Sequence, residues 1–475
     1  MNLYRNMVLA LVSAALFNCC KTPALVKAPE IQKIPETYGA TADTTKVGII
    51  NWKLFFDDPF LIKLIDTALN RNQELGITLQ EIEIARNEVR MRKGRLLPSA
   101  ETGASLGMEK VGLYTSQGAG DASTDITPGK EVPEWLPDYR LGIIAHWEAD
   151  IWKKLRNAKQ AALDRYLSTV EGRKFVITSL IAEIASGYYE LRALDNQLKI
   201  ITQNIGIQQH ALDVVRVQKQ AASATELAVK KFEAEVLNSR TLEYSVRQQI
   251  KQTENEISLL TGKYPGTIER DTTSFIVSNP KQIQAGIPSA LLENRPDIRQ
   301  AELELAASKL DLQVARAEFF PSLNITAGVG LQAFNPTYLV KLPESVLFSL
   351  AADLAGPLIN KTAIKAEYAN ANARQIQAVF NYERAVLNGF IEVSTEMSNL
   401  SKLTQAYELK KNQVDTLAAS VEIANELFRS ARADYLEVLL TQRDALNARM
   451  EMLETKLSQF KAVIALYRSL GGGWQ

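Results

Sequence analysis

Apolar residues recur every three or four positions over long stretches of the chain, and every second position over short ones. The most regular stretch follows residue 150, where Leu180, Ile184, Gly187 and Leu191 belong to a series that steps by four and three. Such heptad spacing is typical of helices that pack side by side along their length. The pattern weakens over 220–225, which predicts the tip of a helical hairpin. Each arm then has about 50–65 residues, or roughly 75–100 Å at the rise of an α-helix.

Alternation with a period of two predicts strands upstream of this hairpin. A helix expected over 59–95 ends before Pro98, because proline lacks the N–H group that a helix interior needs. Apolar and small or polar residues then alternate over 100–108 and again over 139–147. The segment 109–137 between them is rich in Gly, Ser, Thr, Asp and Pro. We therefore expect a strand, a long exposed loop and a returning strand.

The second half of the chain repeats this plan. A helix over 295–318 ends before Pro321, strands follow on either side of a shorter loop, and a second heptad series turns near 430–434. The last arm ends at Gly471–Gly473, and a weaker copy of this ending lies at 257–263. The chain is therefore an internal duplication.

The N-terminal residues resemble an export signal. Arg5 precedes an apolar run over 7–17, and the only two cysteines, Cys19 and Cys20, follow directly. Leu16 lies three residues before Cys19, as in a lipoprotein acceptor motif, so we expect a lipid on Cys19, with Cys20 as the alternative. Two acyl chains are enough for stable attachment to a bilayer. The other interpretation is that both are incidental thiols.

Charge and strand number narrow the class of protein. The chain has 54 basic and 54 acidic residues, which gives no indication of nucleic-acid binding. The four expected strands each approach the length that crosses a bilayer, and a sheet in lipid must close on itself. Because membrane barrels begin at about eight strands, several copies would have to share one barrel. The alternative is a small soluble sheet.

Several motifs together give a resemblance to a known family. They are Trp52 with the segment 55–59, the segment 147–152 with Arg156, and the segments 287–298, 315–322 and 466–474. In these motifs the chain resembles the outer-membrane efflux factors, the TolC-like exit ducts of tripartite drug and metal pumps in Gram-negative bacteria. Within that family it is most similar to the lipoprotein branch. The resemblance covers nearly the whole mature chain.

The resemblance implies a fold that is mainly α with membrane β. It implies a homotrimer, a β-barrel in the outer membrane with four strands per subunit, and a long periplasmic α-helical barrel. The implied partners are a periplasmic adaptor, a proton-driven inner-membrane pump and outer-membrane lipid. The implied function is export of small molecules, namely drugs, toxic compounds or metal ions, as in multidrug resistance. The resemblance implies no cofactor besides the covalent lipid, with palmitate as an acyl chain.

The expected segments follow from the patterns and the resemblance together. In order they are a signal peptide (1–18), a lipidated tether (19–50), the first-repeat helix with an equatorial region (51–97), the first strand pair (98–149) with an extracellular loop (109–137), the first helical hairpin (150–262), an inter-repeat linker (263–294), the second-repeat helix (295–318), the second strand pair (319–356) with its loop (332–345), the second hairpin (357–470) and a C-terminal tail (471–475).

The resemblance also assigns roles to the two hairpin tips. The periplasmic gate corresponds to residues of the second tip: Asp434, Leu436, Glu437, Leu440 and Arg443. Leu440 stands where relatives commonly carry an aspartate, so Glu437 and Asp434 are the candidate acidic ring. Carboxylates around a three-fold axis repel unless hydrated or bound to a cation, which suits a cation-selective mouth. The alternative is that these are ordinary solvated charges. The adaptor and pump would dock at both tips, on Ala221, Ser223, Thr225, Glu226, Ser430 and Arg432.

Nothing in the sequence indicates an enzyme. The chain has two histidines, His146 and His210, and no His/Cys cluster with the spacing of metal ligands. The glycines 471–473 end a helix, whereas a phosphate-binding loop opens one. Two other functions remain open. One is a lipid-anchored periplasmic coiled-coil scaffold or adaptor, and the other is a duct for protein (type I) secretion.

Overall fold

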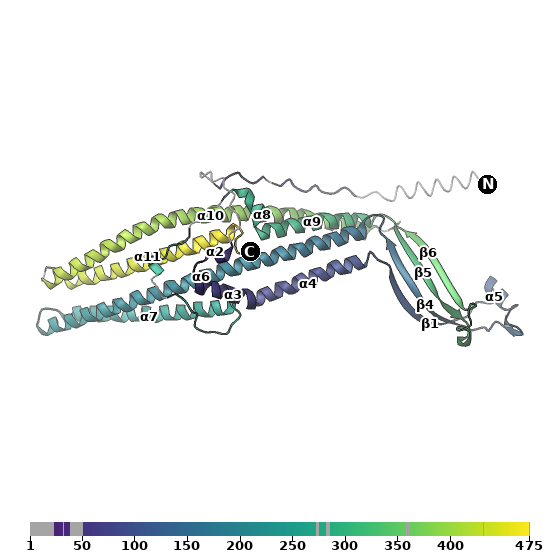
Figure 1. Cartoon of the computed structure of the whole chain (residues 1–475), viewed down its shortest axis with the longest axis horizontal. Coiled ribbons are helices and arrows are strands. Elements are labelled where there is room, and N and C mark those ends of the chain that lie inside the picture. The colour runs from purple at the N-terminus through teal and green to yellow at the C-terminus, as the bar shows by residue number, and fades with distance from the viewer. Residues whose placement is uncertain are drawn as a thin grey trace. The chain divides into compact units, whose positions relative to one another are not determined.

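The computed structural model describes residues 23–31, 33–38, 51–271, 275–281, 286–357, 359, 361–430 and 432–474. The expected signal peptide and the two cysteines lie outside these residues. The chain divides into two compact units (Figure 1). Among the described residues, the first contains those within 23–29, 84–166 and 303–379, and the second contains those within 30–83, 167–302 and 380–474. Each unit is described by itself below.

The first unit is built on a sheet of four antiparallel strands. These are β1 (Ser99–Glu109), β4 (Leu136–Ala149), β5 (Ser322–Ala333) and β6 (Val346–Ala355), and their order in the sheet is the same as in the sequence. All neighbours are antiparallel, so β4 pairs with β5 across the two repeats. The strands predicted from the period of two are therefore present, and β1 and β6 form the two edges.

The register of the sheet separates apolar from polar residues. One row across all four strands is Thr102, Ile143, Val329 and Phe348, and the next row on the same face is Ala104, Leu141, Leu331 and Val346. The opposite face carries rows such as Ser99, His146, Thr326 and Ala351, and Glu101, Ile144, Gly328 and Ser349. Successive side chains point to opposite faces of a strand. One face is therefore apolar, and the other is mostly polar or small.

The loop between β1 and β4 contains secondary structure of its own. It holds α5 (Ser116–Asp121) and a small hairpin of β2 (Asp125–Thr127) and β3 (Lys130–Glu131). The sequence predicted only an exposed loop here. The Thr115 side chain caps α5 by accepting a 3.0 Å bond from Gly118 N. A Cβ on Gly118 would lie 2.2 Å from the Gly112 carbonyl oxygen, so the turn needs glycine.

The helix expected over 59–95 divides into α3 (Pro59–Arg71) and α4 (Gln73–Gly94), after a short α2 (Trp52–Phe55). Asn72 between them is extended, and its side chain bonds the Leu260 carbonyl at 2.9 Å and accepts from Leu75 N at 3.1 Å. The expectation of one continuous helix was wrong, because the tertiary bond to Leu260 and the local bond from Leu75 N hold Asn72 outside helical geometry.

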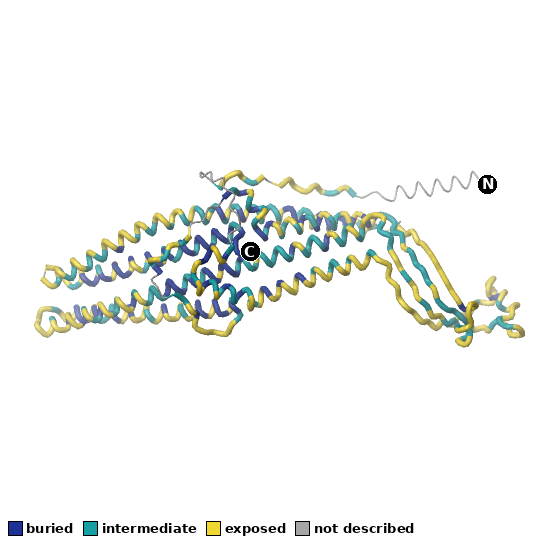
Figure 2. The backbone as a smooth tube through the Cα atoms, viewed as in Figure 1, coloured by how far each residue is buried: buried dark blue, intermediate teal, exposed yellow. Residues whose placement is uncertain are grey.

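The second unit contains most of the two hairpins. The first is α6 (Lys154–Gln220) with α7 (Glu226–Leu260), and the second is α10 (Thr362–Arg429) with α11 (Tyr435–Ser469). In each hairpin the two helices lie side by side (Figure 1). Between the repeats the chain forms η1 (Phe275–Val277), η2 (Pro288–Ala290) and α8 (Leu291–Asn294), and α9 (Pro296–Ala317) follows as a helix of the second repeat. Buried residues concentrate along these packed helices, whereas the edge strands β1 and β6 are exposed along their whole length (Figure 2).

The internal duplication is visible in helix lengths and in helix ends. The paired helices α4 and α9 both have 22 residues, α6 and α10 have 67 and 68, and α7 and α11 both have 35. Gly262 and Gly471 end α7 and α11 with φ of 64° and 84°. In both places the next residue donates to a carbonyl five positions back, Lys263 to Ser258 at 2.9 Å and Gly472 to Tyr467 at 3.1 Å. Both ends are Schellman caps.

Candidate functional site

The tip of the second hairpin lies between Arg429, the last residue of α10, and Tyr435, the first residue of α11. Asp434 occupies the N-cap position of α11 and is exposed, but its side chain forms no capping hydrogen bond. Carboxylates are favourable at this position because the N-terminus of a helix carries partial positive charge. The Asp434 carboxylate therefore lies at the tip and is not used as a hydrogen-bonded cap of α11.

The predicted gate residues lie on the outward face of α11. Leu436, Leu440 and Arg443 are spaced by four and three residues and so share one side of the helix. Leu436 is 45% exposed and Leu440 is 39% exposed, although both are large and apolar. Val438 and Gln442 lie on the other side of α11 and are buried, and Leu439, beside Leu436 around the helix, is buried as well. The structure thus gathers the gate candidates on a surface that nothing in this chain covers among the described residues.

The tip of the first hairpin is a tight turn over 221–225. Ala222 has a positive φ of 56°, and Ser223 N donates to the Gln218 carbonyl at 2.8 Å. Thr225 caps α7 by accepting from Ala228 N at 3.2 Å. The predicted docking residues of both tips are all exposed, namely Ala221, Ser223, Thr225, Glu226, Ser430 and Arg432.

Glu226 at the first tip is held by its own hairpin. Its carboxylate forms an ion pair with Lys219 across the turn. The hydrogen bond from Lys219 lowers the pKa of the Glu226 carboxyl. Glu226 therefore stays ionised at the tip, where the pair with Lys219 joins the last turn of α6 to the first turn of α7.

An apolar cluster joins the two hairpins close to their tips. Leu439 of α11 packs in it with Leu212 and Val215 of α6 and with Phe232 and Val236 of α7. Phe428 and Tyr435 of the second hairpin pack against the same cluster. The sequence located the two hairpins but did not show that they pack against each other near their tips. The segment that carries the predicted gate residues is therefore packed against the first hairpin through Leu439.

A buried arginine organises the region where α3 begins. Arg192 is 5% exposed, and its guanidinium lies 2.8 Å from Asp271 Oδ2 and 3.4 Å from Asp58 Oδ2. Asp58 also caps α3 by accepting from Phe60 N at 2.9 Å. Such a buried charge is tolerated only when it is paired. None of these residues was predicted as a site, and their role here is structural.

A second buried arginine lies in the motif that carries the strongest resemblance. Arg295 is 4% exposed and forms two bonds with Asp297, at 3.0 and 2.6 Å. It also bonds Glu392 at 2.7 Å and the Ser469 carbonyl at 2.9 Å. Burial acts to lower the pKa of Arg295, but Asp297 and Glu392 outweigh it and raise the pKa. Arg295 thereby joins the start of α9 to α10 and to the end of α11.

Aromatic side chains gather where the strands meet the helices of the first unit. Trp152 Nε1 donates to the Pro321 carbonyl at 2.8 Å, and its ring stacks on Phe320 with centroids 4.8 Å apart. Trp147 Nε1 donates to the Leu96 carbonyl at 3.1 Å. Tryptophan is enriched at membrane interfaces because its ring is apolar and its N–H is polar. Here both indole N–H groups donate to backbone carbonyls, so these two side chains tie the end of β4 and the segment after it to the residues before β1 and β5.

Among the residues that the structure describes, no group of three His, Cys, Asp or Glu side chains is placed to hold a metal ion. His146 instead lies 3.3 Å from Thr326 Oγ1 and 3.7 Å from Glu101. Within the same described ranges, no helix combines the length and apolar character needed to cross a membrane. The lipidation candidates Cys19 and Cys20 fall outside the described residues.

The fold is that of known outer-membrane channels. The structure of the open MtrE outer membrane channel of Neisseria gonorrhoeae is similar with a TM-score of 0.82, 24% identity and coverage of 96% of this chain and 99% of that one. A structure of CusC has the same TM-score and identity over 94% of this chain and 99% of its own. Residues 64–263 and 287–472 match the family model described as outer membrane efflux protein. The chain belongs to that family.

Related sequences carry the same kind of description. The pyoverdine export outer membrane protein OpmQ of Pseudomonas aeruginosa is 27% identical, over 98% of this chain and 97% of its own length. The toluene efflux pump outer membrane protein TtgI of Pseudomonas putida is 26% identical over 92% and 91%. The cation efflux system protein CusC of Escherichia coli is 27% identical over 89% and 88%. The predicted family, fold class and efflux function are thereby confirmed.

Proposed function

We propose that this chain is the outer-membrane duct of a tripartite efflux pump and that three copies assemble around one axis. The observation that carries the proposal is the sheet of the first unit. It has four strands, one apolar face and two edges that pair with no other described segment. Such a sheet is unstable in lipid, because each unpaired backbone group there costs several kcal/mol.

Joining copies edge to edge removes both edges. If β1 of one copy pairs with β6 of the next, every backbone group of the sheet finds a partner and the apolar face turns to the lipid. Phe348 and Leu350 of β6 are 82% and 77% exposed, as expected for side chains that meet lipid and not protein. Three copies would give about twelve strands, within the range of membrane barrels.

The helices of the second unit support assembly independently. The α10 helix exposes large apolar side chains that fall on one stripe, because their spacings are close to whole turns of 3.6 residues. They are Phe380, Leu387, Ile391, Leu409 and Ile423, each at least 50% exposed. A stripe of this kind fits a neighbouring subunit in a helical barrel.

The same proposal assigns the remaining parts. The lipid on Cys19, or alternatively on Cys20, anchors the N-terminus to the outer membrane, and the hairpin tips extend into the periplasm to meet an adaptor and a proton-driven pump. Relatives named for pyoverdine, toluene and cations support small molecules or metal ions as cargo. The duct itself performs no reaction on its cargo.

The native mass of the mature protein, extracted from membranes in mild detergent, tests the proposal. We expect three times the mass of the processed chain. Incorporation of labelled lipid is measured on the same material for variants that lack Cys19 or Cys20, and it identifies the cysteine that carries the lipid. A folded monomer would overturn the duct and favour a lipid-anchored scaffold, because four strands alone cannot form a closed sheet.

A further inference from the structure

A cavity of about 690 Å³ lies in the first unit, where the sheet meets the ends of three helices. Its walls come from the last turn of α4, the start of β1, the end of β4, the first turns of α6, the end of α9 and the start of β5. The size is within the range of small-molecule sites. Nothing in the function proposed above uses this cavity.

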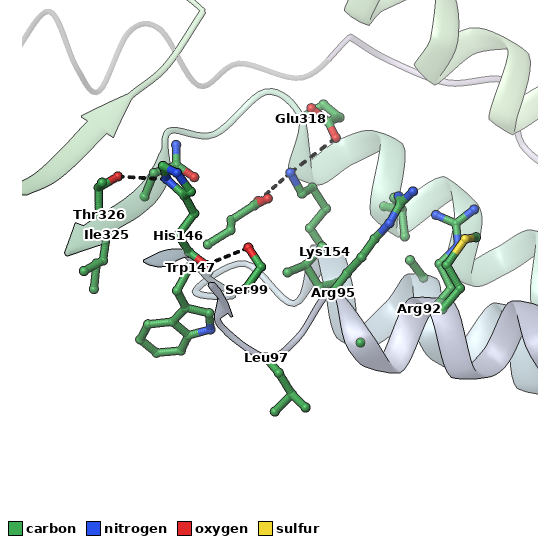
Figure 3. Close-up of a pocket in the computed structure, with 17 residues that line it drawn as sticks. Arg92, Arg95, Leu97, Ser99, His146, Trp147, Lys154, Glu318, Ile325 and Thr326 are labelled. Carbon is green, nitrogen blue, oxygen red and sulfur yellow. Dashed lines mark hydrogen bonds and ion pairs between the residues drawn. The ribbon is translucent and has the colours of Figure 1, made fainter. Parts of the chain in front are cut away.

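The charged and polar side chains around the cavity point to one side of the sheet, and large apolar side chains point to the other. In Figure 3, Arg95, His146, Lys154 and Glu318 extend to one side of the strands, whereas Leu97, Trp147 and Ile325 extend to the other. The sheet register agrees, since His146 lies in the polar row with Ser99 and Thr326, and Trp147 is paired with Ile325. In a closed barrel the polar side faces the lumen. The polar side of the cavity is therefore a niche in the inner wall of the duct.

Most charges in the niche are already paired. Lys154 Nζ lies 2.5 Å from Glu148 Oε1 and 3.8 Å from Glu318 Oε1, so one cation holds two carboxylates. Arg92 Nε bonds Glu88 Oε1 at 2.7 Å on its own helix. Each of these two cations thus already has a carboxylate that balances its charge.

Arg95 is the exception. Its side chain is exposed in the niche, and no ion pair or hydrogen bond links its guanidinium to any residue that the structure describes. A guanidinium has five donors in a planar fork that fits the two oxygens of a carboxylate, sulfonate or phosphate. Hydroxyl groups of Ser99 and Thr326 also line the niche, next to apolar side chains such as Leu155 and Val314.

We infer that this niche is a transient binding site for organic anions with an apolar body, and that Arg95 binds the anionic group. The inference rests on the proposed function, because it takes the polar face of the sheet to be the lumen. Binding must be weak, since a conduit needs sites that cargo can leave as well as enter. In a trimer the niche would occur once in each subunit and so form a ring at the junction of strands and helices.

Fluorine NMR of para-trifluoromethylbenzoate with the full-length detergent-solubilised protein tests the inference, because line broadening reports weak binding whether or not the duct conducts. The test variant is Arg95→Gln. The matched control is Arg90→Gln, an exposed arginine in the last turns of α4, five residues before Arg95 and outside the niche. The uncharged para-trifluoromethylbenzyl alcohol and empty micelles measure binding that does not depend on charge.

We expect the dissociation constant of the benzoate to rise about threefold or more in Arg95→Gln, as for loss of one exposed charge-assisted contact, and to stay unchanged in Arg90→Gln. Arg95→Lys should recover part of the loss, because a lysine keeps the charge but not the fork. If wild type and Arg95→Gln broaden the fluorine signal of the benzoate equally, the niche is not the proposed binding site. The same conclusion follows if the benzoate signal broadens no more than that of the alcohol. A monomeric native mass would instead contradict the proposed duct. The failure of the proposed function and the failure of the anion site are therefore distinguished by different measurements.

Discussion

Tyr188 Oη donates a 2.6 Å hydrogen bond to Asp58 Oδ2, and so links the middle of α6 to the N-cap of α3 across 130 residues of sequence. Tyr188 is fully buried, and the same carboxylate oxygen also faces Arg192 at 3.4 Å. One aspartate thus caps a helix, accepts from a tyrosine and balances a buried arginine. The packing of this region depends on that shared group.

Replacing Tyr188 by phenylalanine should destabilise the protein. The change removes the hydroxyl and leaves the buried Asp58 oxygen without its shortest hydrogen bond, which costs about 1–2 kcal/mol. Denaturant unfolding monitored by circular dichroism measures the effect. The control is Tyr244→Phe, because Tyr244 is 74% exposed. A Tyr188→Phe protein as stable as the control would show that the bond contributes nothing to folding.

Acid should weaken the start of α6 through Asp150. Its carboxylate accepts from Leu155 N and Arg156 N, both at 3.0 Å, and from Arg156 Nε at 2.9 Å. Burial acts to raise the pKa of Asp150, but the bonds from Arg156 and Leu155 outweigh it and lower the pKa. Because the folded pKa is below the unfolded value of about 3.9, the stabilisation is present above that pH and is lost as the pH falls through the folded pKa.

Asp150→Asn should therefore reduce the difference in unfolding free energy between pH 7 and pH 3. Urea unfolding at the two pH values measures this difference. Asp415→Asn is the control, because Asp415 lies exposed on α10 and should leave the difference as in wild type. If the unfolding free energy changes equally between pH 7 and pH 3 in Asp150→Asn and in wild type, the Asp150 carboxylate does not have this role.

Leu436→Ser should raise the resting conductance of the reconstituted protein. Leu436 is exposed on the outward face of α11, where three copies around an axis would close an apolar ring. A serine there admits water and loosens the ring. Single-channel recording in planar bilayers measures the change, and Leu259→Ser, at a residue 73% exposed far from the tips, is the control. Unchanged conductance in Leu436→Ser would remove this residue from the gate.

The two faces of β6 should respond differently to charge. Phe348→Arg should prevent stable insertion, because an arginine near the middle of the lipid face of a barrel costs about 2–4 kcal/mol. Ser349→Arg on the next position should be tolerated, because it points to the polar face that carries Glu101 and Gly328 in the same row. Heat-modifiable trimer bands in membrane extracts measure both. Equal tolerance of the two variants would contradict the assignment of the faces.

The sequence predicted the elements that depend on long regular patterns. Heptad steps such as Leu180 to Ile184 located both hairpins, and the alternation around Ile143 and Val329 located the strands. The break at Asn72 was missed because no glycine or proline marks it and the hydrogen bond to Leu260 comes from 188 residues away. The small elements α5, β2 and β3 were missed because each is too short to show a period.

The candidate site was predictable only in part. The tips could be located because the heptad pattern weakens there, but the packing of Leu439 against Phe232 joins hairpins that are far apart in sequence. The position of Arg95 was not predictable for a related reason. Its significance depends on Lys154 and Arg92 having partners while Arg95 has none among the described residues, and no sequence pattern records which charges are paired.

The glycine caps have a consequence for how the two repeats can diverge. A Cβ on Gly262 would lie 2.4 Å from the Arg71 carbonyl oxygen, and one on Gly471 would lie 2.4 Å from the Asn294 carbonyl oxygen. At the base of each hairpin the main chain of the glycine therefore lies directly against another main-chain carbonyl. This contact does not depend on the identity of the surrounding side chains. The sequences of the two tips can therefore diverge from each other, while these main-chain contacts keep the same geometry at the base of both hairpins.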